Sequence, residues 1–143
     1  MKFIAVFFFY LFCITLNAQS DHDLAESYFD NGEFEKALYY YKKLNISQPR
    51  NSKFVFKIVK IYQELEQYDY SQEIIESQLR ETNNPQYLVE LGYNFQLKNQ
   101  LDIAQENYNK AISRARSNPA FSYSIALKFE KYSLINQAIS VLK

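Results

Sequence analysis

The sequence predicts an all-α fold, a solenoid of antiparallel helix hairpins with about four repeats and eight helices. Three residue classes recur along the chain at spacings of 34, 33 and 34. Branched aliphatic residues recur at Leu24, Ile58, Leu91 and Ile125, each followed by a small residue at Ala25, Val59, Gly92 and Ala126. Aromatic residues recur at Tyr28, Tyr62, Phe95 and Phe129. A fixed period of this length is typical of stacked helical hairpins. With only 2 glycines and 3 prolines in 143 residues, the composition also suits helices better than a turn-rich β fold.

The first repeat, residues 19–51, is predicted to contain helices over about 20–31 and 34–44. Ser20 can cap the first of these helices, because its hydroxyl can accept from a free backbone N–H of the first turn. Asn31-Gly32 is a turn signal that separates the two helices.

The other repeats are predicted to span residues 52–84, 85–118 and 119–143. The third opens with Asn84-Pro85 and the fourth with Asn118-Pro119, which predict an N-cap followed by proline at the first helical position. The second repeat is the least regular, because Ser71 stands where the others have alanine.

Small residues predict where the two helices of a hairpin cross. Ala25 and Ala37 are 12 residues apart, as are Gly92 and Ala104. Antiparallel helices approach to about 8–10 Å only where the side chains at the crossing are small. We therefore expect each of these pairs to meet across its hairpin.

Residues 1–18 have the layout of a secretory signal peptide. A basic start at Lys2 precedes an uncharged apolar run, and small and polar residues follow it. We predict cleavage after Ala18; an uncleaved anchor and lipid attachment at Cys13 are the alternatives. The run is shorter than the roughly 20 apolar residues of a membrane span, so the mature chain is not expected to cross a membrane. The expected location is the periplasm of a bacterium.

These residues resemble the tetratricopeptide repeat (TPR) family. The residues of the first unit that match the family pattern are Leu24, Ala25, Tyr28, Gly32, Phe34, Ala37, Tyr41, Leu44 and Pro49. The third unit matches at Leu91, Gly92, Phe95, Leu101, Ala104, Tyr108 and Ala111. The resemblance implies a right-handed superhelix with a concave groove, lined by the first helix of each hairpin, that binds a peptide or a protein.

The last repeat ends without the polar cap helix that members of this family usually have. Its apolar residues include Ile125, Phe129, Ile135, Ile139 and Leu142. We therefore expect this edge to contact a second copy of the chain or further polypeptide.

Enzymatic chemistry is not expected from this sequence. His22 is the one histidine, and it lies beside two aspartates near the mature N-terminus, where it has no fixed set of partners for a metal ion or for acid–base catalysis. The sequence has no glycine-rich phosphate loop, so we predict no cofactor. Sixteen basic residues balance sixteen acidic ones, which argues against nucleic acid as the partner.

The candidate partner-binding groove is predicted from helical spacing on the first helix of each hairpin. Residues three and four apart share a helix face. The predicted groove residues are Lys53, Phe56, Lys57, Lys60, Val89, Tyr93, Gln96, Tyr123 and Leu127. Aromatic anchors beside lysines could hold an extended or helical peptide that carries acidic groups. The alternative is that the lysines form an ordinary solvated face.

The sequence thus predicts an exported scaffold that binds a protein or peptide in this groove. The alternative function is an N-terminal accessory or sensing domain of a longer enzyme or sensor kinase, whose catalytic part lies beyond Lys143.

Overall fold

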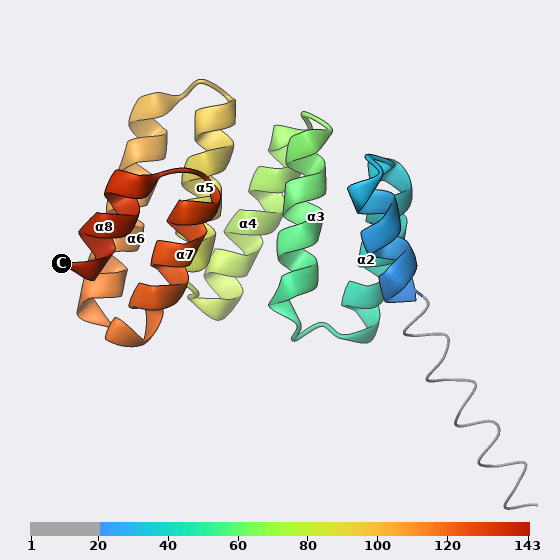
Figure 1. Cartoon of the computed structure of the whole chain (residues 1–143), viewed down its shortest axis with the longest axis horizontal. Helices are drawn as coiled ribbons and strands as arrows, with labels where there is room; N and C mark the ends of the chain where they lie inside the picture. The colour runs from blue at the N-terminus through green and yellow to red at the C-terminus, as the bar shows by residue number, and fades with distance from the viewer. Residues whose placement is uncertain (1–20) are drawn as a thin grey trace, which may run out of the picture. The chain divides into compact units, whose positions relative to one another are not determined.

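The computed structural model describes residues 21–143, and within that range it contains eight α-helices, one short 3-10 turn and no strand (Figure 1). The all-helical prediction is confirmed. The predicted signal peptide lies outside the described residues. No helix in this range combines the length and the apolar character that a membrane span requires.

The chain divides into two compact units, one ending at Leu65 and one covering Glu66–Lys143. The division falls inside the predicted second repeat, between its two helices. Each unit is described by itself.

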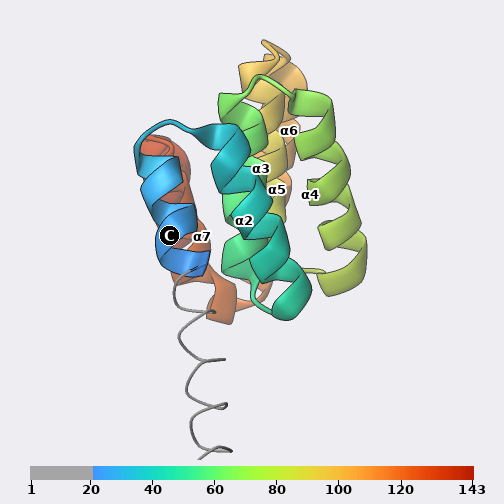
Figure 2. The same ribbon diagram turned by 90° about the vertical axis from the view of Figure 1, so that its right-hand side faces the viewer.

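The first unit contains a helix over residues 21–30, followed by α2 (Phe34–Ser47) and α3 (Ser52–Glu64) (Figure 2). Gly32 separates the first two helices with a φ of 75°, which an L side chain rarely adopts. Ala25 and Ala37 are both fully buried, as the predicted helix crossing requires. Asn51 caps α3, because its side-chain oxygen accepts from the backbone N–H of Lys53.

The second unit contains five α-helices and the 3-10 turn. They are α4 (Tyr68–Thr82), α5 (Gln86–Leu97), α6 (Leu101–Ser117), η1 (Pro119–Phe121), α7 (Ser122–Lys131) and α8 (Ile135–Leu142). The α5–α6 and α7–α8 pairs are hairpins; α4 packs on α5, and α7 packs on both α5 and α6.

The predicted caps of this unit are present. Asn84 accepts a hydrogen bond from the N–H of Gln86 at 3.0 Å, and Asn118 accepts one from Ala120 at 3.2 Å. After Asn118 the chain first forms the 3-10 turn η1 and only then α7.

The turns repeat as the helices do. Gly32, Glu66, Asn99 and Ser133 all have positive φ, and they follow one another at spacings of 34, 33 and 34. Every turn between the two helices of a predicted repeat therefore uses the same left-handed position, although a glycine occupies it only in the first.

The core of the second unit lies between its two hairpins. Phe129 and Ile125 of α7 are fully buried in one cluster with Tyr108 and Ala104 of α6. The rings of Tyr108 and Phe129 meet edge to face, with centroids 5.5 Å apart. This contact fixes which side of α7 faces inward.

Candidate functional site

The predicted stripe on α3 occupies the less buried side of that helix. Lys53 is exposed, and Phe56, Lys57 and Lys60 are half-buried, whereas Ile58 on the other side is buried. The structure thus places these four side chains on one face, as helical spacing predicted.

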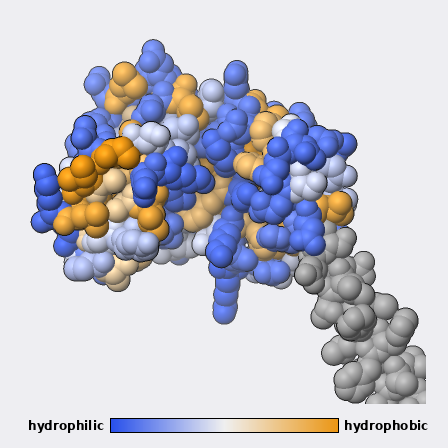
Figure 3. Space-filling model, viewed as in Figure 1, coloured by the Kyte–Doolittle hydropathy of each residue, from blue (hydrophilic) through white to orange (hydrophobic). Residues whose placement is uncertain are grey.

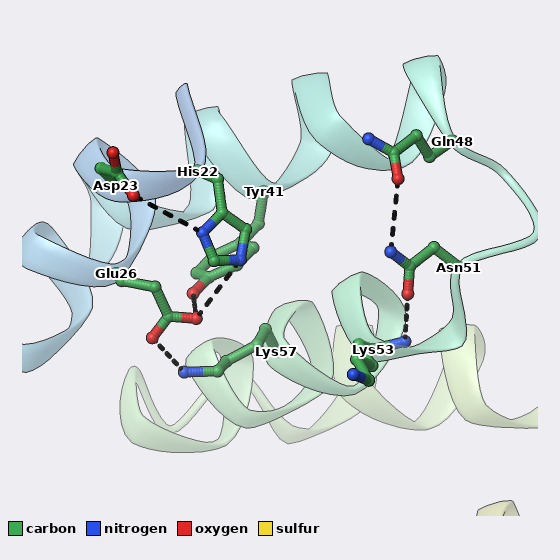
Figure 4. Close-up of polar contacts among 8 residues, drawn as sticks. All are labelled: His22, Asp23, Glu26, Tyr41, Gln48, Asn51, Lys53 and Lys57. Atoms are coloured by element: carbon green, nitrogen blue, oxygen red, sulfur yellow. Dashed lines mark hydrogen bonds and ion pairs between the residues drawn. The ribbon is translucent and has the colours of Figure 1, made fainter. Parts of the chain in front are cut away.

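Lys57 does not extend freely into solvent, because Glu26 of the first helix binds its ammonium group (Figure 4). Its Nζ donates to Oε2 of Glu26 at 2.8 Å, and Tyr41 donates its hydroxyl to Oε1 of the same carboxylate at 2.6 Å. The ammonium also lies 4.2 Å from the centre of the Phe29 ring. One carboxylate therefore links three helices of the first unit.

Lys60 also has an acidic partner, Glu64, at 2.6 Å one turn further along α3. The sequence predicted three lysines available to an acidic peptide. In the structure two of them are neutralised by neighbouring glutamates, so the face is less basic than predicted. Lys53 forms no side-chain ion pair with any residue of the described range.

Glu26 is ionised more readily than an ordinary glutamate. Burial opposes its charge, but the hydrogen bonds from Lys57 and Tyr41 outweigh burial and hold the pKa of Glu26 below its usual value. For Tyr41, burial and the adjacent Glu26 carboxylate raise the pKa well above that of a free tyrosine. Its hydroxyl therefore remains a hydrogen-bond donor to Glu26.

Replacing Lys57 with methionine is expected to raise the pKa of Glu26, because its strongest donor is lost. Since the folded-state pKa is lowered, this contact stabilises the fold above the unfolded pKa of Glu26, and the stabilisation fades as the pH falls through the folded value. Both groups are about one-third exposed, so the loss at neutral pH should be at most about 1 kcal/mol. NMR titration of the Glu26 carboxyl in both proteins measures the shift; an unchanged pKa contradicts the contact.

In the second unit one predicted groove residue is not on the surface. Val89 is fully buried in the cluster between the two hairpins. The prediction that it lines a groove is therefore wrong, and the reason is that α7 packs on α5. Tyr93 is half-buried on the same helix and stacks on Tyr132, the residue that follows α7, with ring centres 3.8 Å apart.

The remaining predicted residues keep contact with solvent. Gln96 is half-buried and accepts a hydrogen bond from the hydroxyl of Tyr108 at 2.9 Å. Tyr123 and Leu127 of α7 are both exposed.

The sequence analysis missed a buried charge cluster between α5 and α7. Glu90 is 1% exposed; its Oε1 accepts from Lys128 Nζ at 2.6 Å and its Oε2 accepts from the Tyr132 hydroxyl at 2.6 Å. Burial, together with the charge of Glu90, raises the pKa of Tyr132 well above its usual range, so this hydroxyl stays protonated. The available signal was the place of Glu90 in the sequence, directly between Val89 and the core residue Leu91.

A shallow apolar cavity of about 240 Å³ lies on the outer side of α7 and α8. Figure 3 shows hydrophobic side chains gathered over these two helices. The lining residues are Tyr123, Ala126, Leu127, Glu130, Ile135, Ala138, Ile139 and Leu142. This is the edge that the sequence predicted to be uncapped.

A metal centre has no candidate among residues 21–143, which contain no group of three or more histidine, cysteine or acidic side chains placed to hold an ion. His22 lies 4.0 Å from both Asp23 and Glu26, at a partly exposed position.

No known family model matches the chain, and no curated protein sequence matches it. Solved structures do match. The type III secretion translocator chaperone SycD of Yersinia enterocolitica superposes with a TM-score of 0.66 at 16% identity, covering 85% of this chain and 90% of SycD. PcrH, solved in complex with the chaperone binding region of PopB, gives 0.62 at 15% identity over 78% of this chain and 91% of PcrH. MamA gives 0.56 at 18% identity over 87% of this chain and 68% of MamA.

The described chain has a TPR-like helical-repeat fold. The superpositions establish the fold. At sequence identities of 15–18% they do not identify a binding partner.

Proposed function

We propose that this protein is an exported, non-enzymatic scaffold that binds a peptide or a segment of another protein in the concave groove expected of its repeats. The observation that carries the proposal is the shared fold with PcrH, which was solved holding the chaperone binding region of PopB. Export to the periplasm rests on the sequence of residues 1–18 alone.

Aromatic and apolar side chains, more than charge, are the expected anchors. On the first unit, Phe56 is the aromatic residue of the α3 face, with Lys53 beside it for an acidic group. On the second unit, Tyr123 and Leu127 are the exposed residues of the predicted set. Buried aromatic anchors commonly supply most of the binding energy, while rim charges mainly steer the encounter.

The apolar edge on α7 and α8 shares Tyr123 and Leu127 with the predicted groove, and in this proposal its remaining residues are covered by a second copy of the chain or by further polypeptide. In the alternative function, an enzyme or sensor kinase domain follows Lys143. The coding sequence downstream of Lys143 separates that alternative from a free-standing scaffold.

Photo-crosslinking tests the α3 face. We expect a photoreactive phenylalanine analogue at position 56 to capture a defined envelope protein in the native cell. The same analogue at Tyr39, which is 65% exposed on α2, should not capture it. A synthetic peptide covering the captured segment should bind the purified chain, and Phe56→Ser should weaken that binding about tenfold or more. Equal capture at both positions, or an affinity that Phe56→Ser leaves unchanged, contradicts the proposal.

A further inference from the structure

The first helix and the last hairpin of the described residues each expose apolar side chains. The residues at the equivalent positions of other repeats are buried. We define the amino-terminal face as Leu24 and Tyr28 on helix 21–30. We define the carboxy-terminal face as the apolar residues Tyr123, Leu127, Ile135, Ile139 and Leu142 on α7 and α8. Each face belongs to one unit and is described within that unit.

The amino-terminal face is the inner face of helix 21–30, the first helix of the described residues. Leu24 is 36% exposed, whereas its repeat equivalents Ile58, Leu91 and Ile125 are 4%, 8% and 0% exposed. In α7, the equivalent residues Ile125 and Phe129 are the ones that pack against the preceding hairpin. Helix 21–30 thus presents the kind of side chains with which α7 docks.

The carboxy-terminal face lies on the α7–α8 hairpin, on the side that corresponds to the one where the preceding hairpin receives α7. Tyr123 and Leu142 are 72% and 66% exposed, while Val89 and Tyr108, each 34 residues earlier, are buried. Within the second unit, α7 lies on α5 and α6 and buries those two residues. The face on α7 and α8 is therefore shaped to receive a helix in the same manner.

Charge favours a pairing between these two faces. Helix 21–30 carries four carboxylates and no lysine or arginine; Asp21 and Glu26 are paired with lysines of the first unit, and Asp23 and Asp30 remain. Residues 122–143 carry three lysines and a single glutamate, and the first of these lysines is paired with the buried carboxylate of Glu90. Without these internal pairs, the helix of the amino-terminal face is still acidic and the hairpin of the carboxy-terminal face still has a small positive charge.

We propose that the amino-terminal face of one copy of this chain docks on the carboxy-terminal face of a second copy, head to tail. The first helix of the second copy continues the stack as α7 continues it on α5 and α6. Such an interface is heterologous: both partners keep one unused face, so association does not stop at a dimer unless a ring closes. This inference concerns the ends of the array. Tyr123 and Leu127 belong both to the carboxy-terminal face and to the predicted groove, whereas Leu24 and Leu142 belong to the two faces alone.

Sedimentation velocity of the purified protein over a concentration series tests the proposal. We expect the wild-type chain to form species larger than a dimer as its concentration rises. Leu24→Glu and Leu127→Glu should each be monomeric, because each places a carboxylate in an apolar contact. Leu142→Glu is a second variant of the carboxy-terminal face that lies outside the predicted groove, and it should behave as Leu127→Glu. The side chains of Leu24, Leu127 and Leu142 are all at least one-third exposed, so the fold should survive, as circular dichroism will show.

Mixing the two single variants decides the geometry. Leu24→Glu keeps an intact carboxy-terminal face and Leu127→Glu keeps an intact amino-terminal face, so an equimolar mixture should form dimers and nothing larger. Tyr39→Glu, an exposed aromatic on neither face, should associate like the wild type. If Leu24→Glu associates as the wild type does, α7 and α8 instead meet their own copies, and the proposal fails. A wild-type chain that stays monomeric up to about 100 µM also overturns it.

Discussion

Lys128→Met is expected to lower the free energy of unfolding by about 3–5 kcal/mol, because it leaves Glu90 as an uncompensated buried charge. Glu90 is 1% exposed, and the Lys128 side chain is 10% exposed. Without the ammonium, the carboxylate still accepts a hydrogen bond from the hydroxyl of Tyr132, which carries no charge to balance it. Urea denaturation followed by circular dichroism measures the loss.

Two further variants separate burial from the mere presence of an ion pair. Lys36→Met removes an ion pair with Glu33 that is exposed, and it should change the stability far less than Lys128→Met does. Replacing Glu90 and Lys128 together with methionine removes both charges while keeping side-chain volume, and should restore most of the lost stability. A Lys128→Met protein as stable as Lys36→Met would show that Glu90 is not isolated from water.

Most of the fold could be predicted from the sequence, because the residues that recur about every 34 positions are those that helix crossings and helix starts require. Ala25 and Ala37 are small because two helices cross there, and Asn84 and Asn118 stand where a helix start needs a side-chain acceptor. These requirements are local, so they are visible in a single sequence. The turn at Gly32 was predicted for the same reason. Its equivalents at Glu66, Asn99 and Ser133 carry no glycine, so their left-handed conformation was not evident from residue type.

The candidate site could be predicted only in part, because helical spacing tells which side chains share a face and not what covers them. Lys53, Phe56, Lys57 and Lys60 do share a face of α3, but Glu26, on a different helix, neutralises Lys57. Val89 has the same repeat position as exposed Tyr123, and it is buried because α7 follows it. Whether a side chain at such a position is exposed depends on the next hairpin, whose residues lie about 34 positions further along the chain.

Gly92→Ala is expected to destabilise the second unit by about 1–3 kcal/mol, although alanine is the better helix former by about 1 kcal/mol. A Cβ at this position of α5 would overlap the ring of Tyr108 and would lie 3.0 Å from the backbone oxygen of Ala104. The ring of Tyr108 has little room to move. Its hydroxyl donates to Gln96, and the ring packs edge to face with the buried ring of Phe129. Crowding should therefore outweigh propensity, and urea denaturation gives the sign directly.

The same substitution in a Tyr108→Leu background tests whether Tyr108 is the cause. Tyr108→Leu alone should destabilise the unit, since it removes a buried ring. Adding Gly92→Ala to it should then cost less than it does in the wild type, because the overlapping ring atoms are gone and mainly the Ala104 oxygen remains close. Ala126 has the repeat position of Gly92 on α7, and Ala126→Gly should simply lose about 1 kcal/mol of helix propensity. If Gly92→Ala costs the same in both backgrounds, the tight α5–α6 crossing is limited by the backbone of Ala104 and not by Tyr108.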